Sequence, residues 1–226
     1  MNLQHVNILI QLIVFLLAIS VHESAHAWMA RREGDPTAYM LGRVTLNPLK
    51  HIDPIGTLLL PAIALFTHLP VIGWAKPTPV NTRNFKHLVR SDVLTSVAGP
   101  ASNLLVAMGG VMLMAFIALT SVSGHVIVHN LALHSITDTN SPLMPLALIL
   151  YQAIFINVLL AIFNLIPIPP LDGSHVLRHF LPRSALRMYD MMGMFALVAL
   201  FLVGGPFLNM LFYPVIGAVN AVLTKL

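Results

Sequence analysis

The residues best suited to chemistry form the pattern His-Glu-x-x-His at His22, Glu23 and His26, at the end of an apolar run. On a helix, two histidines four positions apart lie on the same face, so both imidazoles can bind one metal ion. Glu23, beside the first histidine, can act as a general base toward water. The alternative is a helix with two ordinary polar contacts. Ionisable groups in an apolar segment of membrane length are costly and usually functional, which favours a site.

A catalytic metal site of this kind needs about three protein ligands and one open position. The chain has no cysteine, so the ligands must come from His, Asp or Glu. The strongest third candidate is Asp172, at the end of a proline-broken stretch that follows an apolar segment. The alternative is that Asp172 caps a short helix over residues 173–181. Asp53 and Asp92 are weaker candidates, each near basic residues and a helix start.

Asn164 precedes Asp172 by eight residues, and its amide can donate a hydrogen bond to a developing negative oxygen. The alternative is a polar contact between helices, which is the commoner role of asparagine in a membrane. Three further histidines could form a second metal patch, although a solvated loop is the simpler interpretation of them: His125, His129 and His134.

The composition is typical of an integral membrane protein. The 226 residues are 57% hydrophobic and 9% charged, with a mean hydropathy of +0.84, whereas soluble domains contain about 25% charged residues. Several apolar stretches are long enough to span a bilayer about 30 Å thick. The net charge of +4 is small and the basic residues cluster in certain loops. This clustering indicates membrane topology and argues against nucleic-acid binding.

We therefore expect an all-α membrane protein, a polytopic helix bundle of about five to six transmembrane segments. A single domain over residues 1–226 is predicted, with a core over 1–182 and a C-terminal helical hairpin over 187–225. The spans are expected at about residues 6–30, 92–120, 142–166, 188–203 and 207–223.

Two segments between the first spans are expected to differ from ordinary helices. Residues 37–46 are rich in β-forming types and predict a small membrane-associated β element. Residues 55–69 are short, contain Pro61 and have basic residues on both sides. A re-entrant segment is favoured there over a short tilted span, because a true span separates a side rich in basic residues from a side poor in them.

Basic residues also predict orientation in a cell membrane. Arg31 and Arg32 place the end of the first helix in the cytoplasm and the N-terminus outside, and Lys225 agrees with a cytoplasmic C-terminus. The loop over residues 121–141 has no Lys or Arg and is expected outside.

This topology places the His22 and His26 face roughly 8 to 14 Å inside the cytoplasmic boundary. Asp172 reaches the same depth if residues 92–120 cross the membrane and residues 55–69 do not. The topology thus favours ligation over capping for Asp172.

Taken in order, the motifs of the chain resemble those of the site-2 protease family of zinc intramembrane metalloproteases, in its short bacterial or archaeal form. The resemblance is carried by several segments along most of the chain: residues 22–30, 34–38, 42–48, 51–54 and 73–77, residues 98–100 with Asn103, and the stretch 164–173. It implies one Zn²⁺ held by His22, His26 and Asp172, with Glu23 as the general base and Asn164 assisting near the scissile carbonyl. The PDZ insert and the CBS domain of larger members are not expected here.

The implied activity is hydrolysis of a peptide bond in or beside the transmembrane helix of a substrate. Family members often cut membrane-bound regulators such as anti-sigma factors. The substrate helix must unwind locally, and the residues near 39–46 or 76–80 could then pair with it by strand addition. Gly42, Lys76 and Pro77 are the candidate substrate-binding residues in these stretches.

Two other classes of function use the same residues. A metal transporter or metal sensor would need a continuous polar path, and the spans offer few ionisable residues to line one. A catalytically silent scaffold would not need a base at Glu23.

Overall fold

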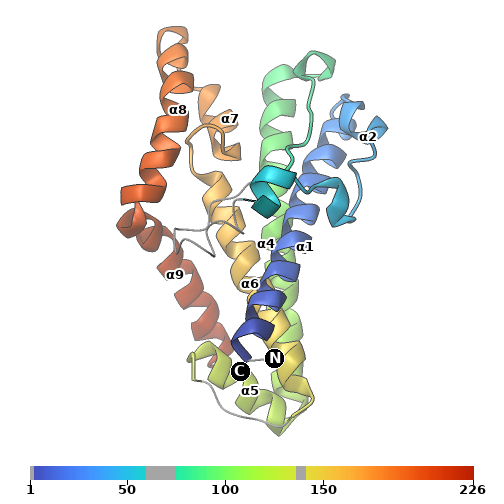
Figure 1. Cartoon of the computed structure of the whole chain (residues 1–226), viewed down its shortest axis with the longest axis vertical. Helices are drawn as coiled ribbons and strands as arrows, with labels where there is room; N and C mark the ends of the chain where they lie inside the picture. The colour runs from blue at the N-terminus through green and yellow to red at the C-terminus, as the bar shows by residue number, and fades with distance from the viewer. Residues whose placement is uncertain (1–2, 60–74, 136–140) are drawn as a thin grey trace. The chain divides into compact units, whose positions relative to one another are not determined.

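The computed structural model describes residues 3–59, 75–135 and 141–226 (Figure 1). Within these ranges the chain is helical and contains no strand. The α-helices are α1 (Leu3–Arg32), α2 (Thr37–Met40), α4 (Leu88–Thr120), α5 (Val122–Ala132), α6 (Leu143–Leu165), α7 (Asp172–Arg178), α8 (Arg183–Val203) and α9 (Gly205–Leu223). Shorter turns of other helix types are η1 (Pro48–Lys50), η2 (Pro54–Leu59) and η3 (Thr82–Asn84).

Four of the described helices are long and apolar enough to cross a membrane: α1, α4, α6 and α9. This supports the predicted all-α, multi-pass membrane protein. The expected C-terminal hairpin is also present as a pair of helices, since α8 ends at Val203 and α9 begins at Gly205. Helix α8 is not among the four candidate spans.

The predicted β element over residues 37–46 is wrong. These residues form the single helical turn α2 followed by turns and bends. The cause is local hydrogen bonding, because the Asp35 carboxylate accepts from both the backbone N–H and the hydroxyl of Thr37 and starts a turn there. Gly42 then adopts a φ of +68°, a left-handed conformation that interrupts an extended strand.

The loop predicted over residues 121–141 contains helix α5. Ser121 caps this helix, since its hydroxyl accepts a hydrogen bond of 2.9 Å from the N–H of Gly124. The re-entrant segment predicted over residues 55–69 lies mostly outside the described residues, and only its first part is seen, within η2.

The chain forms two compact units, one of residues 16–102 and one of residues 1–15 and 103–226. In the second unit, helices α5, α6 and α9 contact one another. The core that these helices share with the later part of α4 contains fully buried Met114, Ile154 and Leu223. A polar bond crosses the apolar interior of the same unit, because buried Asn103 donates from its amide to the Oδ1 of buried Asn157 at 2.7 Å. Such bonds between membrane helices hold a pairing in register.

In the unit of residues 16–102, the fully buried carboxylate of Asp35 connects three segments. Besides Thr37, it accepts from the backbone N–H of Asn81 at 2.7 Å and from the side-chain amide of Asn84 at 2.8 Å. Burial alone would raise the pKa of Asp35, but these hydrogen bonds outweigh it and place the pKa below its ordinary value. Asp35 thereby fixes the end of α1 to the segment that leads into α4.

We expect Asp35→Asn to lower the stability of the protein by about 2 kcal/mol, because an amide nitrogen would face donors that now meet a carboxylate oxygen. The folded pKa is below the unfolded value of about 3.9, so the charged form contributes stability that is present above that pH and lost as the pH falls through the folded pKa. The difference in unfolding temperature between wild type and variant, measured in detergent, should therefore be largest near neutral pH and shrink below about pH 4.

The matched control is Asp190→Asn, since Asp190 pairs with Arg178 at 2.7 Å in an exposed position. Exposed pairs contribute little, so this variant should unfold close to the wild-type temperature. A pH-independent deficit in Asp35→Asn would contradict the assigned role of its charge.

Candidate metal site

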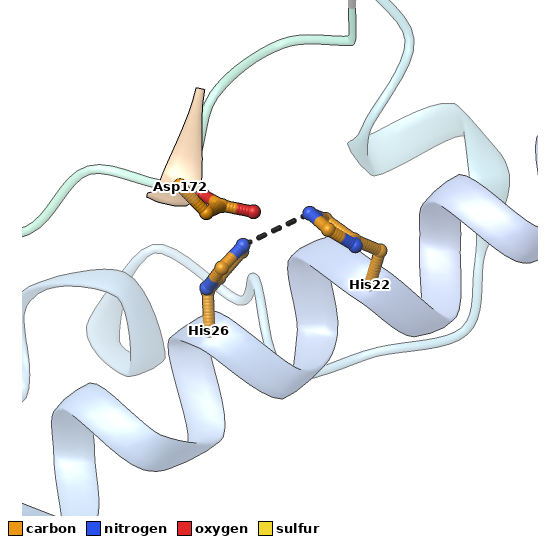
Figure 2. A group of neighbouring side chains, drawn as sticks. All are labelled: His22, His26 and Asp172. Atoms are coloured by element: carbon orange, nitrogen blue, oxygen red, sulfur yellow. Dashed lines mark hydrogen bonds between the residues drawn. The ribbon is translucent and has the colours of Figure 1, made fainter. Parts of the chain in front are cut away.

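The predicted histidine pair lies on one face of α1, as Figure 2 shows. His22 and His26 are buried, with 6% and 7% of their surface exposed. Their rings meet edge to face, with centroids 4.6 Å apart, and their Nε2 atoms are 3.0 Å apart. Two nitrogens bound to one tetrahedral zinc at about 2.0–2.1 Å would be separated by about 3.3 Å. The spacing of the two Nε2 atoms therefore suits a shared ion.

The orientation of His26 is fixed by helix α4. Its Nδ1 lies 2.7 Å from the backbone carbonyl oxygen of Thr95. A carbonyl can only accept, so Nδ1 must carry the hydrogen and, in the neutral ring, Nε2 keeps its lone pair. Metal-binding histidines commonly make this second hydrogen bond, which sets both tautomer and ring direction.

Gly99, also on α4, allows this close approach to the two imidazoles. A Cβ built at Gly99 would lie 2.4 Å from Nε2 of His26 and 2.7 Å from Cε1 of His22. Separations under 3.0 Å require something to move. Glycine at position 99 thus leaves room for the nitrogens that would face a metal ion.

Asp172 is the first residue of α7, which has Leu171 at its cap position and no side-chain cap. Asp172 therefore stands inside the first turn and not at the capping position that the alternative interpretation gave it. One ligand atom each of His22, His26 and Asp172 lies within 4.8 Å of the other two (Figure 2). Among the described residues, this is the one such group of three that could hold a metal ion.

The donor set suits zinc, since it offers two imidazole nitrogens and a carboxylate oxygen without thiolates. The weaker candidate Asp53 has another role, because its carboxylate accepts from the backbone N–H groups of Ile55 and Gly56. The rings of His125 and His129 stack with centroids 6.1 Å apart, but they belong to no described group of three metal ligands.

Glu23 lies between the two histidines on α1 and is held from the segment before η3. Its Oε2 accepts from the backbone N–H of Thr78 at 2.9 Å and from the Thr78 hydroxyl at 2.7 Å. The same hydroxyl lies 3.0 Å from the backbone oxygen of Glu23. One of the two carboxylate oxygens of Glu23 thus has two fixed donors.

Asn164 is half-buried near the end of α6, and its amide donates to the carbonyl of Leu160 one turn earlier at 3.0 Å. An amide has two N–H donors, so this bond uses half of its donating capacity.

The three candidate substrate-binding residues, Gly42, Lys76 and Pro77, are exposed. The N–H of Lys76 donates to the carbonyl of His51 at 2.9 Å. Since Pro77 and Pro79 have no N–H and that of Thr78 is bound to Glu23, the stretch from Lys76 to Pro79 has its N–H groups engaged or missing.

Three residues that contact the motif were not singled out from the sequence as site residues: Thr78, Thr95 and Gly99. Thr78 and Thr95 contact it through hydrogen bonds that span 55 and 69 residues. The sequence did contain a feature that could have identified Gly99, because Gly-Pro within an apolar helix is unusual and indicates that another backbone or side chain approaches closely there. Nothing in the local sequence distinguishes Thr95 from its neighbours, since only its backbone oxygen is used.

Comparison with known proteins shows to which family the chain belongs. Residues 10–204 match the family model described as Peptidase family M50. The chain belongs to this family, the site-2 protease family. It is 34% identical over 217 residues to the "Putative zinc metalloprotease YwhC" of Bacillus subtilis (strain 168), covering 95% of this chain and 89% of that protein.

Two other relatives carry the same description. The chain is 29% identical to the "Putative zinc metalloprotease Rip2" of Mycolicibacterium smegmatis, covering 80% of this chain and 62% of that protein. It is also 29% identical to the protein of that name from Mycobacterium tuberculosis (strain H37Rv), covering 89% of this chain and 69% of the relative. No solved structure is significantly similar. This M50 member is thus a multi-pass membrane zinc metallopeptidase of the site-2 protease type.

We expect Gly99→Ala to weaken zinc binding at least tenfold, because the added methyl group would displace the His22 and His26 rings. The measurement is zinc affinity by competition with a chelating dye. Gly109→Ala on the same helix is the matched control, since a Cβ there meets nothing within 4 Å, and it should bind zinc as the wild type does. Equal affinity in the two variants would show that the close approach at Gly99 is unimportant.

Proposed function

We propose that this M50 protein is an intramembrane zinc metalloendopeptidase, which hydrolyses a peptide bond in or near the transmembrane helix of a membrane-anchored substrate. The observation that carries the proposal is the buried pair His22 and His26, with Nε2 atoms 3.0 Å apart and Glu23 between them on α1. Membership of the M50 family supports the same activity.

In this proposal His22, His26 and Asp172 bind one Zn²⁺. Zinc, when bound, acidifies a water molecule and polarises a carbonyl group. The hydrogen bond from Nδ1 of His26 to the Thr95 carbonyl keeps the ligand nitrogen aimed at the ion. The support for Asp172 is the 4.8 Å limit on the separation of the three ligand atoms.

Two further side chains act on the substrate. Glu23 is the general base, taking a proton from the attacking water and delivering it to the leaving amine nitrogen. Asn164 donates an amide N–H to the oxygen on which negative charge develops. Its bond to Leu160 supports this assignment, because it fixes the side chain while a second N–H remains for the substrate.

A substrate helix must unwind before its carbonyl can be attacked, because helical carbonyls are already hydrogen-bonded. We propose that the unwound segment binds the exposed stretch at Lys76 and Pro77. Gly42, which lies in the turn after α2, is the third proposed substrate-binding residue. Since the N–H groups between Lys76 and Pro79 are engaged or missing, the substrate backbone would donate to this stretch and not accept from it.

The number of membrane spans, the identity of the membrane and the orientation of the chain in it are part of the same proposal. Of the five to six spans predicted in the cell membrane, we assign five, namely the four apolar helices and α8. The basic end of α1 at Arg31 and Arg32 supports a cytoplasmic position for that end and an external N-terminus. The lipid bilayer and a transmembrane protein are the partners, and a membrane-bound regulator such as an anti-sigma factor is the proposed kind of substrate.

The metal transporter or sensor is the weaker alternative. It would need further ionisable ligands along the membrane-spanning helices. Among the described residues, His22, His26 and Asp172 form the one group of three metal-ligating side chains, so a chain of such sites has no support.

We expect Glu23→Gln to lower the cleavage rate of a model transmembrane substrate by at least a hundredfold, because an amide cannot accept the proton. The measurement is cleavage by purified protein reconstituted in lipid, with zinc content determined on the same sample. Zinc should remain at the wild-type level, since Glu23 is not a ligand in this proposal. A variant that retains zinc and cleaves at the wild-type rate would remove Glu23 as the base.

A further inference from the structure

The carboxylate of Glu23 is held by one residue from outside its own helix. The backbone N–H and the hydroxyl of Thr78 both donate to Oε2 of Glu23, at 2.9 and 2.7 Å. A hydroxyl has a single hydrogen, and the shorter of its two contacts is to the carboxylate, since the backbone oxygen of Glu23 lies 3.0 Å away. Both donors therefore converge on the same oxygen atom.

Thr78 is itself fixed independently of Glu23. Pro77 and Pro79 flank it and restrict the backbone on both sides. The segment is anchored before Thr78 by the N–H of Lys76, which donates to the His51 carbonyl at 2.9 Å. It is anchored after Thr78 by the N–H of Asn81, which donates to Asp35.

A second anchor acts on the carbonyl side of the same segment. The buried guanidinium of Arg43 donates to the backbone oxygens of Lys50 and Lys76. The donors of Thr78 are thus held in place by several bonds that do not involve the carboxylate. Such preorganisation is what a group needs if it is to orient a catalytic side chain.

We propose that Thr78 is a positioning residue for the general base. By binding Oε2, it turns Oε1 of Glu23 toward the face of α1 that carries His22 and His26. Oε1 is then the atom that takes the proton. This inference rests on the proposed function, and Thr78 acts only through Glu23 without touching the substrate. A glutamate side chain has three rotatable bonds, so an unheld carboxylate would spend much of its time in other rotamers.

The competing explanation is that Thr78 merely ties the segment 75–81 to α1. The two explanations differ in what the hydroxyl does. Thr78→Val keeps the shape and the backbone N–H but removes the hydroxyl, while Thr78→Ser keeps both donors. A structural tie would mainly alter stability, whereas an orienting bond would alter the rate of the chemical step at constant substrate affinity.

The experiment measures kcat and KM for cleavage of a model transmembrane substrate by the zinc-loaded protein in lipid. We expect Thr78→Val to lower kcat by about 10- to 100-fold with KM and zinc content near wild type, as for the loss of a group that orients a catalytic residue. Thr78→Ser should restore kcat to within about threefold of wild type. Thr82→Val is the matched control, since Thr82 is exposed in η3, and it should leave kcat unchanged.

A second arm tests whether Thr78 acts through Glu23. In the Glu23→Gln background, adding Thr78→Val should not lower the residual rate further, because the base it orients is gone. An equal loss in both backgrounds would overturn the inference, as would a wild-type kcat in Thr78→Val or a failure of serine to rescue. A wild-type protein that cleaves nothing would contradict the proposed function, whereas an active protein insensitive to Thr78→Val contradicts this inference alone.

Discussion

The hydrogen bond from Nδ1 of His26 to the Thr95 carbonyl is the constraint on which the site depends. It joins α1 to α4 across 69 residues of sequence and selects the tautomer that leaves Nε2 able to bind a metal. The bond is possible only because Gly99, one turn further along α4, has no side chain to occupy the space beside the imidazoles. In this unit the packing of the helices therefore determines the orientation of the ligand, because α4 must lie close to α1 for the Thr95 carbonyl to bind His26.

In the same unit, buried polar groups hold the described residues between these two helices, 33–59 and 75–87. Asp35 ties the end of α1 to Asn81 and Asn84, and Arg43 ties the turn after α2 to Lys50 and Lys76. Buried charges of this kind are costly unless their hydrogen-bonding capacity is used, and these carboxylate and guanidinium groups bind neighbouring segments. These bonds hold the described residues on either side of Thr78, which donates to Glu23. The buried side chains of Asp35 and Arg43 therefore act by positioning other residues.

Much of this could be predicted from the sequence, because the informative features were local. The spacing of His22 and His26, the apolar runs and the proline-broken stretch before Asp172 are all periodic or compositional, and they predicted the helices and the candidate ligands. The β element over residues 37–46 was wrong because its β-forming residues were outweighed by the Asp35 turn and the left-handed Gly42. Helix α5 was missed because a segment without basic residues was interpreted only as an external loop. The roles of Thr78 and Thr95 could not be predicted from the sequence, since they arise from contacts between segments that are distant in it.

The central claim is that His22, His26 and Asp172 bind one zinc ion, and zinc binding by Asp172→Ala tests it most directly. The wild-type protein should bind one zinc per chain, and the variant should lose at least tenfold in affinity with its thermal unfolding in the zinc-free state unchanged. Asp53→Ala is the comparison, because the Asp53 carboxylate binds the backbone N–H groups of Ile55 and Gly56, and it should keep wild-type zinc affinity. Equal zinc affinity in wild type and Asp172→Ala would contradict the account.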